Sequence, residues 1–431
     1  MATRFEPLGP LRGTLRPPPD KSVSHRAALI AAMGEGETAI EGYLDSADTR
    51  STLTAVEALG ATVEGAEGAG IGPTVRIRGA GLRGAAPAEI DVGNAGTLLR
   101  LLPGWVAGQA GGAWTLDGDD SIRRRPVDRI AVPLRAMGAA LGCREGRLPP
   151  LRIEGAPLRG VTYELPVASA QVKSCLLFAG LLAEGETRVL EPLPSRDHSE
   201  RMLAAAGAEI ERADGAVSVR PAQRLEPGEI VVPADFSSAA FFVVAALIAP
   251  GSEIVLDGVG LNPTRTGLLG ILGRMGAEIE VESEGERGGE PIGRIRARAS
   301  ELHGTEIGGA EIPLAIDELP LVALAACFAE GATAIRDAAE LRRKESDRIA
   351  TVSEALVALG ADVEQAGDGM RIEGSGGLRG GAIHSHGDHR IAMLGAIAGL
   401  ACRDGVEVEG MDAAAVSYPG FAADLASLLG S

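Results

Sequence analysis

The chain repeats one pattern six times along its 431 residues, and this repetition constrains its fold more than any other feature. In each copy a polar or charged residue precedes an apolar run, a short Gly/Glu turn, a Val/Ile-rich strand and an amphipathic helix. Units of roughly 65–80 residues are typical of closed βαβ-rich subdomains rather than of a solenoid. The copies open at Lys21, Asn94, Ser169, Asp235, Asp317 and Asp388.

Six units in a chain of this length predict an α/β protein of two domains with three units each. The predicted boundary lies near Pro227–Pro233, so that residues 21–232 form one domain and residues 233–431 form most of the other. We expect residues 1–20 to join the second domain, because a strand predicted at Gly9–Leu15 could belong with the C-terminal half. The chain then crosses between the domains twice.

The composition argues against several classes of protein. Apolar residues make up 45% and charged residues 23%, which is typical of a soluble globular protein and excludes disorder as the main state. Aromatic residues are only 3%, so a stacking surface for single-stranded nucleic acid is not expected. The formal net charge of −18 argues against nucleic acid or an anionic membrane as a partner. It does not exclude a small cluster of cations inside a cleft.

The cysteines and the apolar runs indicate the cellular compartment of such a chain. Cys143, Cys175, Cys327 and Cys402 show no C-x-x-C spacing, so we expect buried free thiols rather than disulfides or a zinc site. The longest apolar runs are too short to span a bilayer, and the first residues lack the apolar region of a signal peptide. The expectation is a soluble cytoplasmic protein.

The opening residues of the repeats predict helix N-termini, because Ser, Asn, Asp or a cation stands just before an apolar run too long for an average strand. Free backbone N–H groups and the positive end of the helix dipole gather there. Six such starts around a cleft would bind anions. Each start contributes only about 0.3–1 kcal/mol, so cationic side chains must supply the rest. Ordinary helix caps are the alternative explanation.

Lysine is scarce in this chain. Only Lys21, Lys173 and Lys344 occur, and the other 38 of the 41 basic residues are arginine. A compact, titratable ammonium can lie close to a reacting group, whereas the wide guanidinium stays protonated. All three lysines fall in motif-like segments, which favours a functional role; chance placement is the alternative.

Further motifs carry groups that bind anions or move protons. Gly93–Thr97, with Arg100 one turn later, indicates a close approach of backbone to ligand, where a Cβ would not fit. Asp317-Glu318 and Lys344-Glu345 form an acid–base set. A carboxylate at a helix start stays ionised and suits a general base, whereas a Glu among other anions has a raised pKa and suits an acid. Caps and surface ion pairs would explain the same residues without chemistry.

Together the motifs resemble those of the 5-enolpyruvylshikimate-3-phosphate (EPSP) synthase family, in the same order and over essentially the whole chain. They are Asp20–Arg26, Asn94–Thr97, Arg125-Pro126, Leu341–Arg348 and Asp388-His389-Arg390. The resemblance implies two domains of three βαβαββ units each, an inside-out α/β barrel. It implies transfer of the enolpyruvyl group of phosphoenolpyruvate to the 5-hydroxyl of shikimate 3-phosphate, with release of phosphate, in aromatic amino acid biosynthesis.

The resemblance also implies the partners and the site. It implies no metal and no organic cofactor, two small-molecule substrates, no nucleic acid or membrane partner, and a monomer. By match to the family, Asp317 is the base for the 5-hydroxyl, Glu345 the acid for the enol methylene, and Lys21 shares in proton transfer. Shikimate 3-phosphate is expected at Lys21, Ser22, Arg26, Ser169, Gln171, Arg196, Asp317 and Lys344. Phosphoenolpyruvate is expected at Lys21, Gly96, Arg125, Gln171, Arg348 and Arg390.

The chain departs from the family pattern at two positions. Val416 stands where many members carry a Lys, and Leu101 where many have Pro. Gly96 leaves room that some glyphosate-tolerant members fill with Ala. We therefore expect glyphosate to enter the site, with its potency left open by these departures.

Three alternatives are weighed against this resemblance. The related UDP-N-acetylglucosamine enolpyruvyl transferases carry a Cys in the loop before their Arg-Pro, whereas the matching loop Asp120–Arg125 has no Cys. They also carry Lys-Asn at the first motif, where this chain has Lys21-Ser22. A metal-dependent hydrolase would use the histidines of His384–His389. A non-catalytic anion-binding paralogue would not need to keep the acid–base residues.

Overall fold

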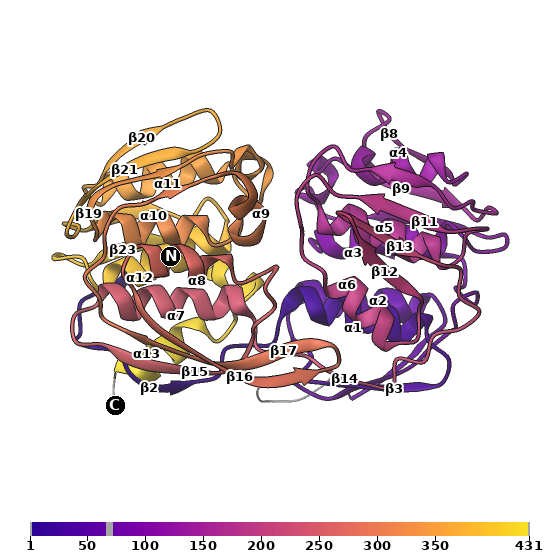
Figure 1. Ribbon diagram of the computed structural model, residues 1–431, viewed down its shortest axis with the longest axis horizontal. Helices are drawn as coiled ribbons and strands as arrows, with labels where there is room; N and C mark the ends of the chain where they lie inside the picture. Colours follow the sequence, from indigo (N-terminus) through magenta and orange to yellow (C-terminus); the bar gives the residue numbers. More distant parts are fainter. Residues whose placement is uncertain (1, 66–71, 430–431) are drawn as a thin grey trace. The chain divides into compact units, whose positions relative to one another are not determined.

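The computed structural model describes residues 2–65 and 72–429. The chain divides into two compact units (Figure 1). The N-terminal unit contains Pro19–Pro233 and Glu286–Glu290, and the C-terminal unit contains Met1–Pro18, Ala234–Gly285 and Pro291–Ser431. Each unit is built from three copies of one arrangement of sheet and helices.

The N-terminal unit has three four-stranded sheets of one topology. Its strands are β3 (Glu37–Glu41), β4 (Thr62–Glu64), β5 (Val75–Arg78), β6 (Ala88–Asp91), β7 (Ala113–Asp117), β8 (Ala140–Arg144), β9 (Leu148–Glu154), β10 (Thr162–Glu164), β11 (Thr187–Leu190), β12 (Ile210–Ala213), β13 (Ala216–Val219) and β14 (Glu229–Val231). The sheets have the orders β14-β3-β5-β4, β6-β7-β9-β8 and β10-β11-β13-β12. The first two strands of each order are parallel and the others pair antiparallel.

The C-terminal unit repeats this topology with one smaller sheet. Its strands are β1 (Ala2–Phe5), β2 (Arg12–Leu15), β15 (Glu253–Gly260), β16 (Glu278–Arg287), β17 (Glu290–Arg298), β18 (Glu306–Ile307), β19 (Glu330–Ile335), β20 (Asp362–Gln365), β21 (Met370–Ser375), β22 (Gly381–His384) and β23 (Val406–Glu409). The orders are β16-β17-β15-β2, β18-β19-β21-β20 and β1-β23-β22. The N-terminal strand β2 lies parallel to β15, and β1 lies antiparallel to β23.

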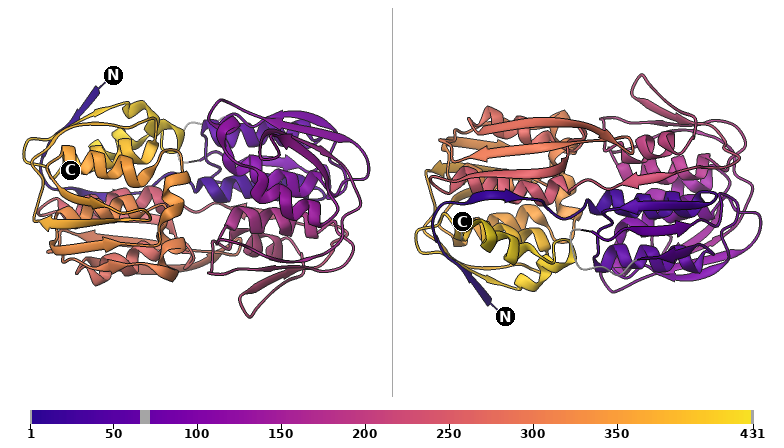
Figure 2. Two further views of the ribbon diagram at one scale, coloured as in Figure 1. Left: turned by 90° about the horizontal axis from the view of Figure 1, so that it is seen from above. Right: turned by 90° about the horizontal axis from the view of Figure 1, so that it is seen from below.

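Two helices accompany most of the sheets, and in each unit helices lie inside a surround of strands (Figure 2). The helices are α1 (Lys21–Met33), α2 (Ala47–Ala58), α3 (Gly96–Val106), α4 (Asp128–Ala136), α5 (Ala170–Gly180), α6 (His198–Ala205), α7 (Phe236–Ile248), α8 (Gly267–Arg274), α9 (Ile312–Ala315), α10 (Leu319–Cys327), α11 (Arg348–Ala358), α12 (His389–Gly399) and α13 (Phe421–Leu429). Short 3₁₀ turns are η1 (Ile122–Arg124), η2 (Gly309–Glu311), η3 (Ala339–Arg343) and η4 (Met411–Val416). Every residue of α7, α10 and α12 is buried, as are most of those of α1, α3 and α5. Helices that are apolar all round form the core of each unit.

The predicted helix starts are confirmed, with differences at two of them. The side chains of Asp20, Ser169, Asp235 and Asp388 cap α1, α5, α7 and α12 by accepting hydrogen bonds from backbone N–H groups. No side chain caps α3, which begins at Gly96 after Ala95, or α10, whose N-cap is Glu318. At these two starts the polar side chains of the motif bond to other side chains instead.

Helices α3 and α5 pack closely because glycine stands at their contact. A Cβ on Gly104 of α3 would lie 2.1 Å from the carbonyl oxygen of Cys175 in α5. Glycine costs helix stability, but here it lets two backbones touch inside the core. This contact fixes the spacing between the N-terminal ends of both helices.

We predict that Gly104→Ala destabilises the protein by about 1–3 kcal/mol, because the methyl group overpacks the α3–α5 contact. The measurement is the free energy of unfolding in urea. The matched control is Gly273→Ala in α8, where a Cβ would meet no atom within 4 Å. That helical substitution should stabilise by up to about 1 kcal/mol. Equal effects of the two substitutions would contradict the packing argument.

Candidate active site

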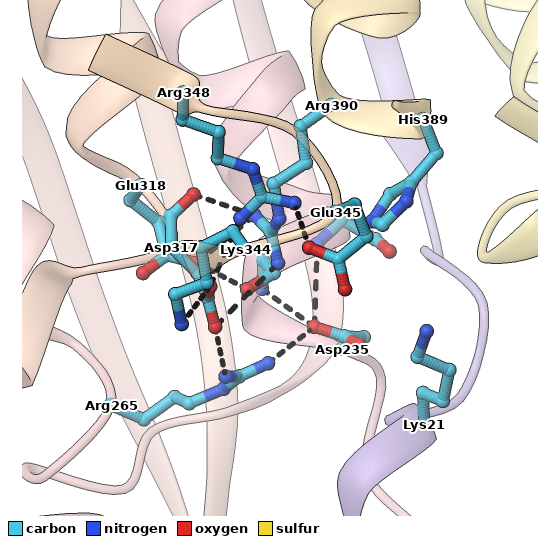
Figure 3. Close-up of polar contacts among 12 residues, drawn as sticks. Lys21, Asp235, Arg265, Asp317, Glu318, Lys344, Glu345, Arg348, His389 and Arg390 are labelled. Atoms are coloured by element: carbon cyan, nitrogen blue, oxygen red, sulfur yellow. Dashed lines mark hydrogen bonds and ion pairs between the residues drawn. The ribbon is translucent and has the colours of Figure 1, made fainter. Parts of the chain in front are cut away.

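In the C-terminal unit, four cations surround the carboxylate of Asp317 (Figure 3). Lys344 Nζ lies 3.2 Å and Arg348 Nη1 3.3 Å from Asp317 Oδ1. On the other oxygen, Arg265 Nη1 and Arg390 Nη2 each lie 3.9 Å from Oδ2. The four cations come from the start of α11, the turn before it, α12 and the loop before α8. Folding therefore gathers these charges from distant parts of the sequence.

Arg348, the first residue of α11, joins three carboxylates. Its side chain is 1% exposed and lies 2.9 Å from Asp388 Oδ2 through Nε and 2.7 Å from Glu345 Oε2 through Nη2. Burial lowers the pKa of Arg348, but the charges of Asp388 and Glu345 outweigh burial and hold it above its ordinary value. Burial raises the pKa of Asp388, and the Arg348 guanidinium outweighs that effect, leaving this carboxyl below its usual range. Both groups are therefore ionised at neutral pH.

Arg390 and Glu318 complete this cluster. Arg390 Nη1 donates to the backbone oxygen of Asp317 at 2.8 Å and lies 3.5 Å from Glu318 Oε1. Glu318 is fully buried and accepts a very short hydrogen bond from Ser237 Oγ. The starts of α7, α10 and α12 are thus tied together by side chains. Glu345 keeps 32% of its side chain exposed, and Lys344 keeps 23%, so both can reach a ligand.

In the N-terminal unit, a second group of cations lies at the starts of α1 and α3. Lys21 Nζ lies 3.0 Å from Asp48 Oδ2. Burial raises the pKa of Asp48, but the charge and hydrogen bond of Lys21, together with other nearby cations, outweigh burial and hold that pKa below its ordinary value. Arg125 Nη2 donates to Asn94 Oδ1 at 3.0 Å, and a Cβ on Gly96 would lie 2.6 Å from Arg125 Nη1. The guanidinium therefore rests against the bare backbone of α3.

Arg26 ties three helices together from inside this unit. Its Nε donates to Ser199 Oγ at 2.8 Å in α6, and its Nη2 donates to Ser174 Oγ at 3.2 Å in α5. A third bond runs from Nη1 to the backbone oxygen of Ser22 at 2.9 Å. Burial lowers the pKa of Arg26 to about 10, so the side chain stays charged at neutral pH. Burial also lowers the pKa of the neighbouring His25 to about 3, so this imidazole is neutral.

Gln171 and Ser169 lie at the start of α5. Arg100 Nη1 of α3 donates to Gln171 Oε1 at 2.7 Å, and Gln171 Nε2 donates to Thr97 Oγ1 at 3.2 Å. Ser169 Oγ accepts from the backbone of Val172, so this predicted phosphate ligand also caps the helix. The α3 and α5 starts are thereby held side by side, above the close contact at Gly104.

Lys173 is a buried ion-pair centre rather than a surface cation. It is 1% exposed, and its Nζ lies 2.8 Å from Glu191 Oε2 and 2.7 Å from Glu200 Oε1. It also donates to the backbone oxygen of Ser195 at 3.3 Å, and Ser195 Oγ donates a very short hydrogen bond to Glu191. These contacts hold the loop that carries Arg196, which is half-buried and acts electrostatically on Arg26.

The structure therefore brings the expected residues into two groups, one in each unit. The N-terminal group contains Lys21, Ser22, Arg26, Gly96, Arg125, Ser169, Gln171 and Arg196. The C-terminal group contains Asp317, Lys344, Glu345, Arg348 and Arg390. Sequence analysis missed Asp48, Glu200 and Arg265. Asp48 lies within the Ser46–Thr49 capping box and looks like an ordinary first-turn acid, and Arg265 is one arginine among 38.

Other residues weighed from the sequence lie elsewhere. The rings of His384 and His386 lie on the surface with centroids 4.6 Å apart and planes tilted by 57°, and His386 pairs with Glu354. Across the described residues, no group of three or more His, Cys, Asp or Glu side chains is arranged to hold a metal ion. The four cysteines are free thiols as expected, three of them buried and Cys143 half-buried. Within residues 2–65 and 72–429, none of the helices has the length and apolar character needed to cross a membrane.

Comparison with known proteins agrees with this geometry. The family model of EPSP synthase (3-phosphoshikimate 1-carboxyvinyltransferase) matches residues 5–425. The 3-phosphoshikimate 1-carboxyvinyltransferase of Thermus thermophilus is 51% identical over 429 residues, covering 99% of each chain. That of Desulforudis audaxviator is 49% identical over 431 residues, again covering 99% of each.

Solved structures show the same fold. EPSP synthase from Acinetobacter baumannii superposes with a TM-score of 0.88 at 42% identity, covering 99% of this chain and 98% of that one. The enolpyruvyl transferase NikO from Streptomyces tendae superposes with a TM-score of 0.76 at 18% identity, covering 99% and 96%. The fold is therefore that of the enolpyruvyl transferases, with two inside-out α/β barrels.

Sequence identity of about one half over the full length assigns the chain to one family within this fold. It belongs to the EPSP synthase family of enzymes. The family, the enzyme class and the fold class predicted from the sequence are thereby confirmed.

We predict that Lys173→Met destabilises the protein by about 3–5 kcal/mol, because it leaves two buried carboxylates without their cation. Urea denaturation gives the free energy of unfolding. The double variant Lys173→Met/Glu200→Gln removes one of these anions and should recover part of the loss. A single variant as stable as the parent would mean that the ion pair carries no structural role.

Proposed function

We propose that the protein transfers the enolpyruvyl group of phosphoenolpyruvate to the 5-hydroxyl of shikimate 3-phosphate and releases phosphate. Family membership supports this proposal, and the clustering of cations at helix starts in an acidic protein carries it. At about 4 Å and an effective dielectric constant near 20, one charge pair is worth roughly 4 kcal/mol. Several cations are needed to bind two multiply charged substrates.

Each of the two groups of residues is proposed to contribute to both substrates. Lys21, Gly96 and Arg125 are proposed for phosphoenolpyruvate, since the family match assigns them and the two cations lie at the starts of α1 and α3. Ser22, Arg26 and Arg196, with Ser169 and Gln171, are proposed for shikimate 3-phosphate. In the C-terminal group, Arg348 and Arg390 are proposed for phosphoenolpyruvate, and Asp317 and Lys344 for shikimate 3-phosphate. Arg348 would then exchange a carboxylate partner for a substrate oxygen.

The proposed reaction is an addition followed by an elimination. Asp317 accepts the proton of the 5-hydroxyl as the hydroxyl oxygen bonds to C2 of phosphoenolpyruvate. At the same time Glu345 donates a proton to the methylene carbon of phosphoenolpyruvate. The cations stabilise the tetrahedral intermediate. Elimination breaks the bond from C2 to the phosphate oxygen, and the leaving phosphate takes up the proton held by Asp317. A methyl proton returns to the Glu345 carboxylate as the double bond forms again. Lys21 shares in these proton transfers.

The direct experiment is a phosphate-release assay with both substrates and with each omitted in turn. Release only when both are present supports the proposal. Release from one substrate alone would indicate a phosphatase, and no release with both would overturn the proposal.

We also propose that the 44.0 kDa chain works as a monomer in the cytoplasm. Light scattering of the purified protein tests the first point.

We predict that Asp317→Ala lowers kcat by about 10²–10⁴-fold, the usual contribution of a general base. Binding of shikimate 3-phosphate, measured by calorimetry, should weaken far less than turnover. A thermal melt checks that the variant is folded. Turnover within tenfold of the parent would remove Asp317 from the role of base.

We predict that Gly96→Ala raises the KM for phosphoenolpyruvate by up to about 100-fold, because the new methyl group displaces Arg125. The KM for shikimate 3-phosphate should change less. Glyphosate should inhibit the parent competitively with phosphoenolpyruvate and inhibit this variant less. Gly142→Ala, where a Cβ meets no atom within 4 Å, is the control. No inhibition of the parent at millimolar glyphosate would contradict the expected entry of this compound.

A further inference from the structure

Arg265 lies in a rigid turn before α8. None of the roles assigned above explains this buried arginine. It is 3% exposed, and the neighbouring Asn262 is 1% exposed. Asn262 Oδ1 accepts hydrogen bonds from the backbone N–H and the hydroxyl of Thr264, at 2.9 and 2.7 Å. The backbone oxygen of Asn262 accepts from Arg265 N at 2.8 Å. A turn fixed at both side chain and backbone holds the base of the Arg265 side chain in place.

The Arg265 guanidinium lies between two carboxylates (Figure 3). Its Nη2 lies 3.1 Å from Oδ1 of Asp235, and its Nη1 lies 3.9 Å from Oδ2 of Asp317. Asp235 is itself immobile, because its Oδ1 accepts from the backbone of Ser237 at 2.7 Å and caps α7. The cap of one buried helix therefore anchors the cation that faces Asp317.

Asp317 receives different contacts on its two oxygens. Oδ1 lies within 3.3 Å of both Lys344 and Arg348, whereas Oδ2 faces Arg265 and Arg390 at 3.9 Å. A separation of 3.9 Å exceeds hydrogen-bond distance, so Arg265 acts on Oδ2 by its charge. The other charged or titratable groups of this cluster are Asp235, Glu318, Glu345, Asp388 and His389.

We propose that Arg265 is a positioning residue for the reaction, which orients the Asp317 carboxylate through Oδ2 and keeps it ionised and ready to accept the 5-hydroxyl proton. This inference rests on the proposed function, in which Asp317 is the base. Because Arg265 is buried beneath the carboxylate, it acts through Asp317 and is not assigned a contact with substrate. Its fixed charge works through the low-dielectric interior, where solvent screens it little.

The sign of the pH effect follows from this arrangement. A base must be ionised, so activity falls as the pH drops through the pKa of Asp317. A cation nearby favours the ionised form, and an arginine at this distance typically lowers the pKa of an aspartate by about 1–3 units. Three further cations stay in place when Arg265 is removed, so the lower end of that range applies. Loss of Arg265 should therefore move the acid limb of activity to higher pH.

We predict that Arg265→Met shifts the acid limb of the kcat–pH profile upward by about one pH unit, and that Arg265→Lys shifts it less. Arg274→Met is the matched control. Arg274 ends α8, pairs with Glu311 at 2.7 Å and has 42% of its side chain exposed. The Arg274 variant removes an exposed positive charge from α8 that has its own partner in Glu311, and its acid limb should coincide with that of the parent.

A second variant covers a failure to fold. Arg265→Met/Asp235→Asn removes both charges of the buried pair and keeps a residue type that caps helices well. It should show an upward shift smaller than that of Arg265→Met, because loss of the Asp235 anion partly offsets loss of the cation. Acid limbs that coincide with the parent in every folded Arg265 variant would overturn the inference while leaving the base assignment intact. Retained turnover in Asp317→Ala would overturn the base assignment, and the inference with it.

Discussion

The structure depends on burying charge in balanced groups. In the C-terminal unit, Arg348 is almost completely buried and yet stays ionised, because Asp388 and Glu345 lie within hydrogen-bond distance. A charge removed from water without such partners would cost several kcal/mol. The same guanidinium joins the starts of α11 and α12 to Asp317. The network that makes the unit stable is therefore also the one that places the proposed base.

In the N-terminal unit, buried charge is balanced by hydroxyl groups and a lysine. Arg26 reaches Ser174 and Ser199 on two other helices, and Lys173 neutralises two glutamates behind them. Buried cations of this kind stay in fixed positions, because every displacement would leave a carboxylate or hydroxyl without its partner. Such fixed donors lose little entropy when an anion binds. In both units the repeat supplies the helix ends, and residues unique to each copy supply the charge.

The repeat, the order of elements and the helix starts could be predicted from the sequence because they are local patterns. Asp20, Ser169, Asp235 and Asp388 each precede an apolar run and each cap a helix. The family resemblance supplied the expected substrate residues, since those motifs lie in order along the whole chain.

What the sequence could not provide was the partner of each charge. Arg265 approaches Asp317 only through the fold, across more than fifty residues of sequence, and it stands among many other arginines. The role of Lys173 was equally hidden, because a lysine beside Gln171 and Ser174 looks like a ligand rather than a buried counter-ion. Helix α2 begins at Ala47, earlier than its apolar run, because Ser46 and Thr49 form a capping box.

The pairing of β1 with β23 has a consequence for how the chain is made. Ala2 lies opposite Glu409, and β2 lies beside β15, so these two early strands pair with strands made much later. The N-terminal unit is almost continuous in sequence and can fold during synthesis. In the C-terminal unit the sheet β1-β23-β22 cannot close until β23 (Val406–Glu409) has been made, and contacts this distant in sequence form slowly. Until then β1 lacks its partner, so its backbone N–H and C=O groups stay unpaired while the rest of the chain is made.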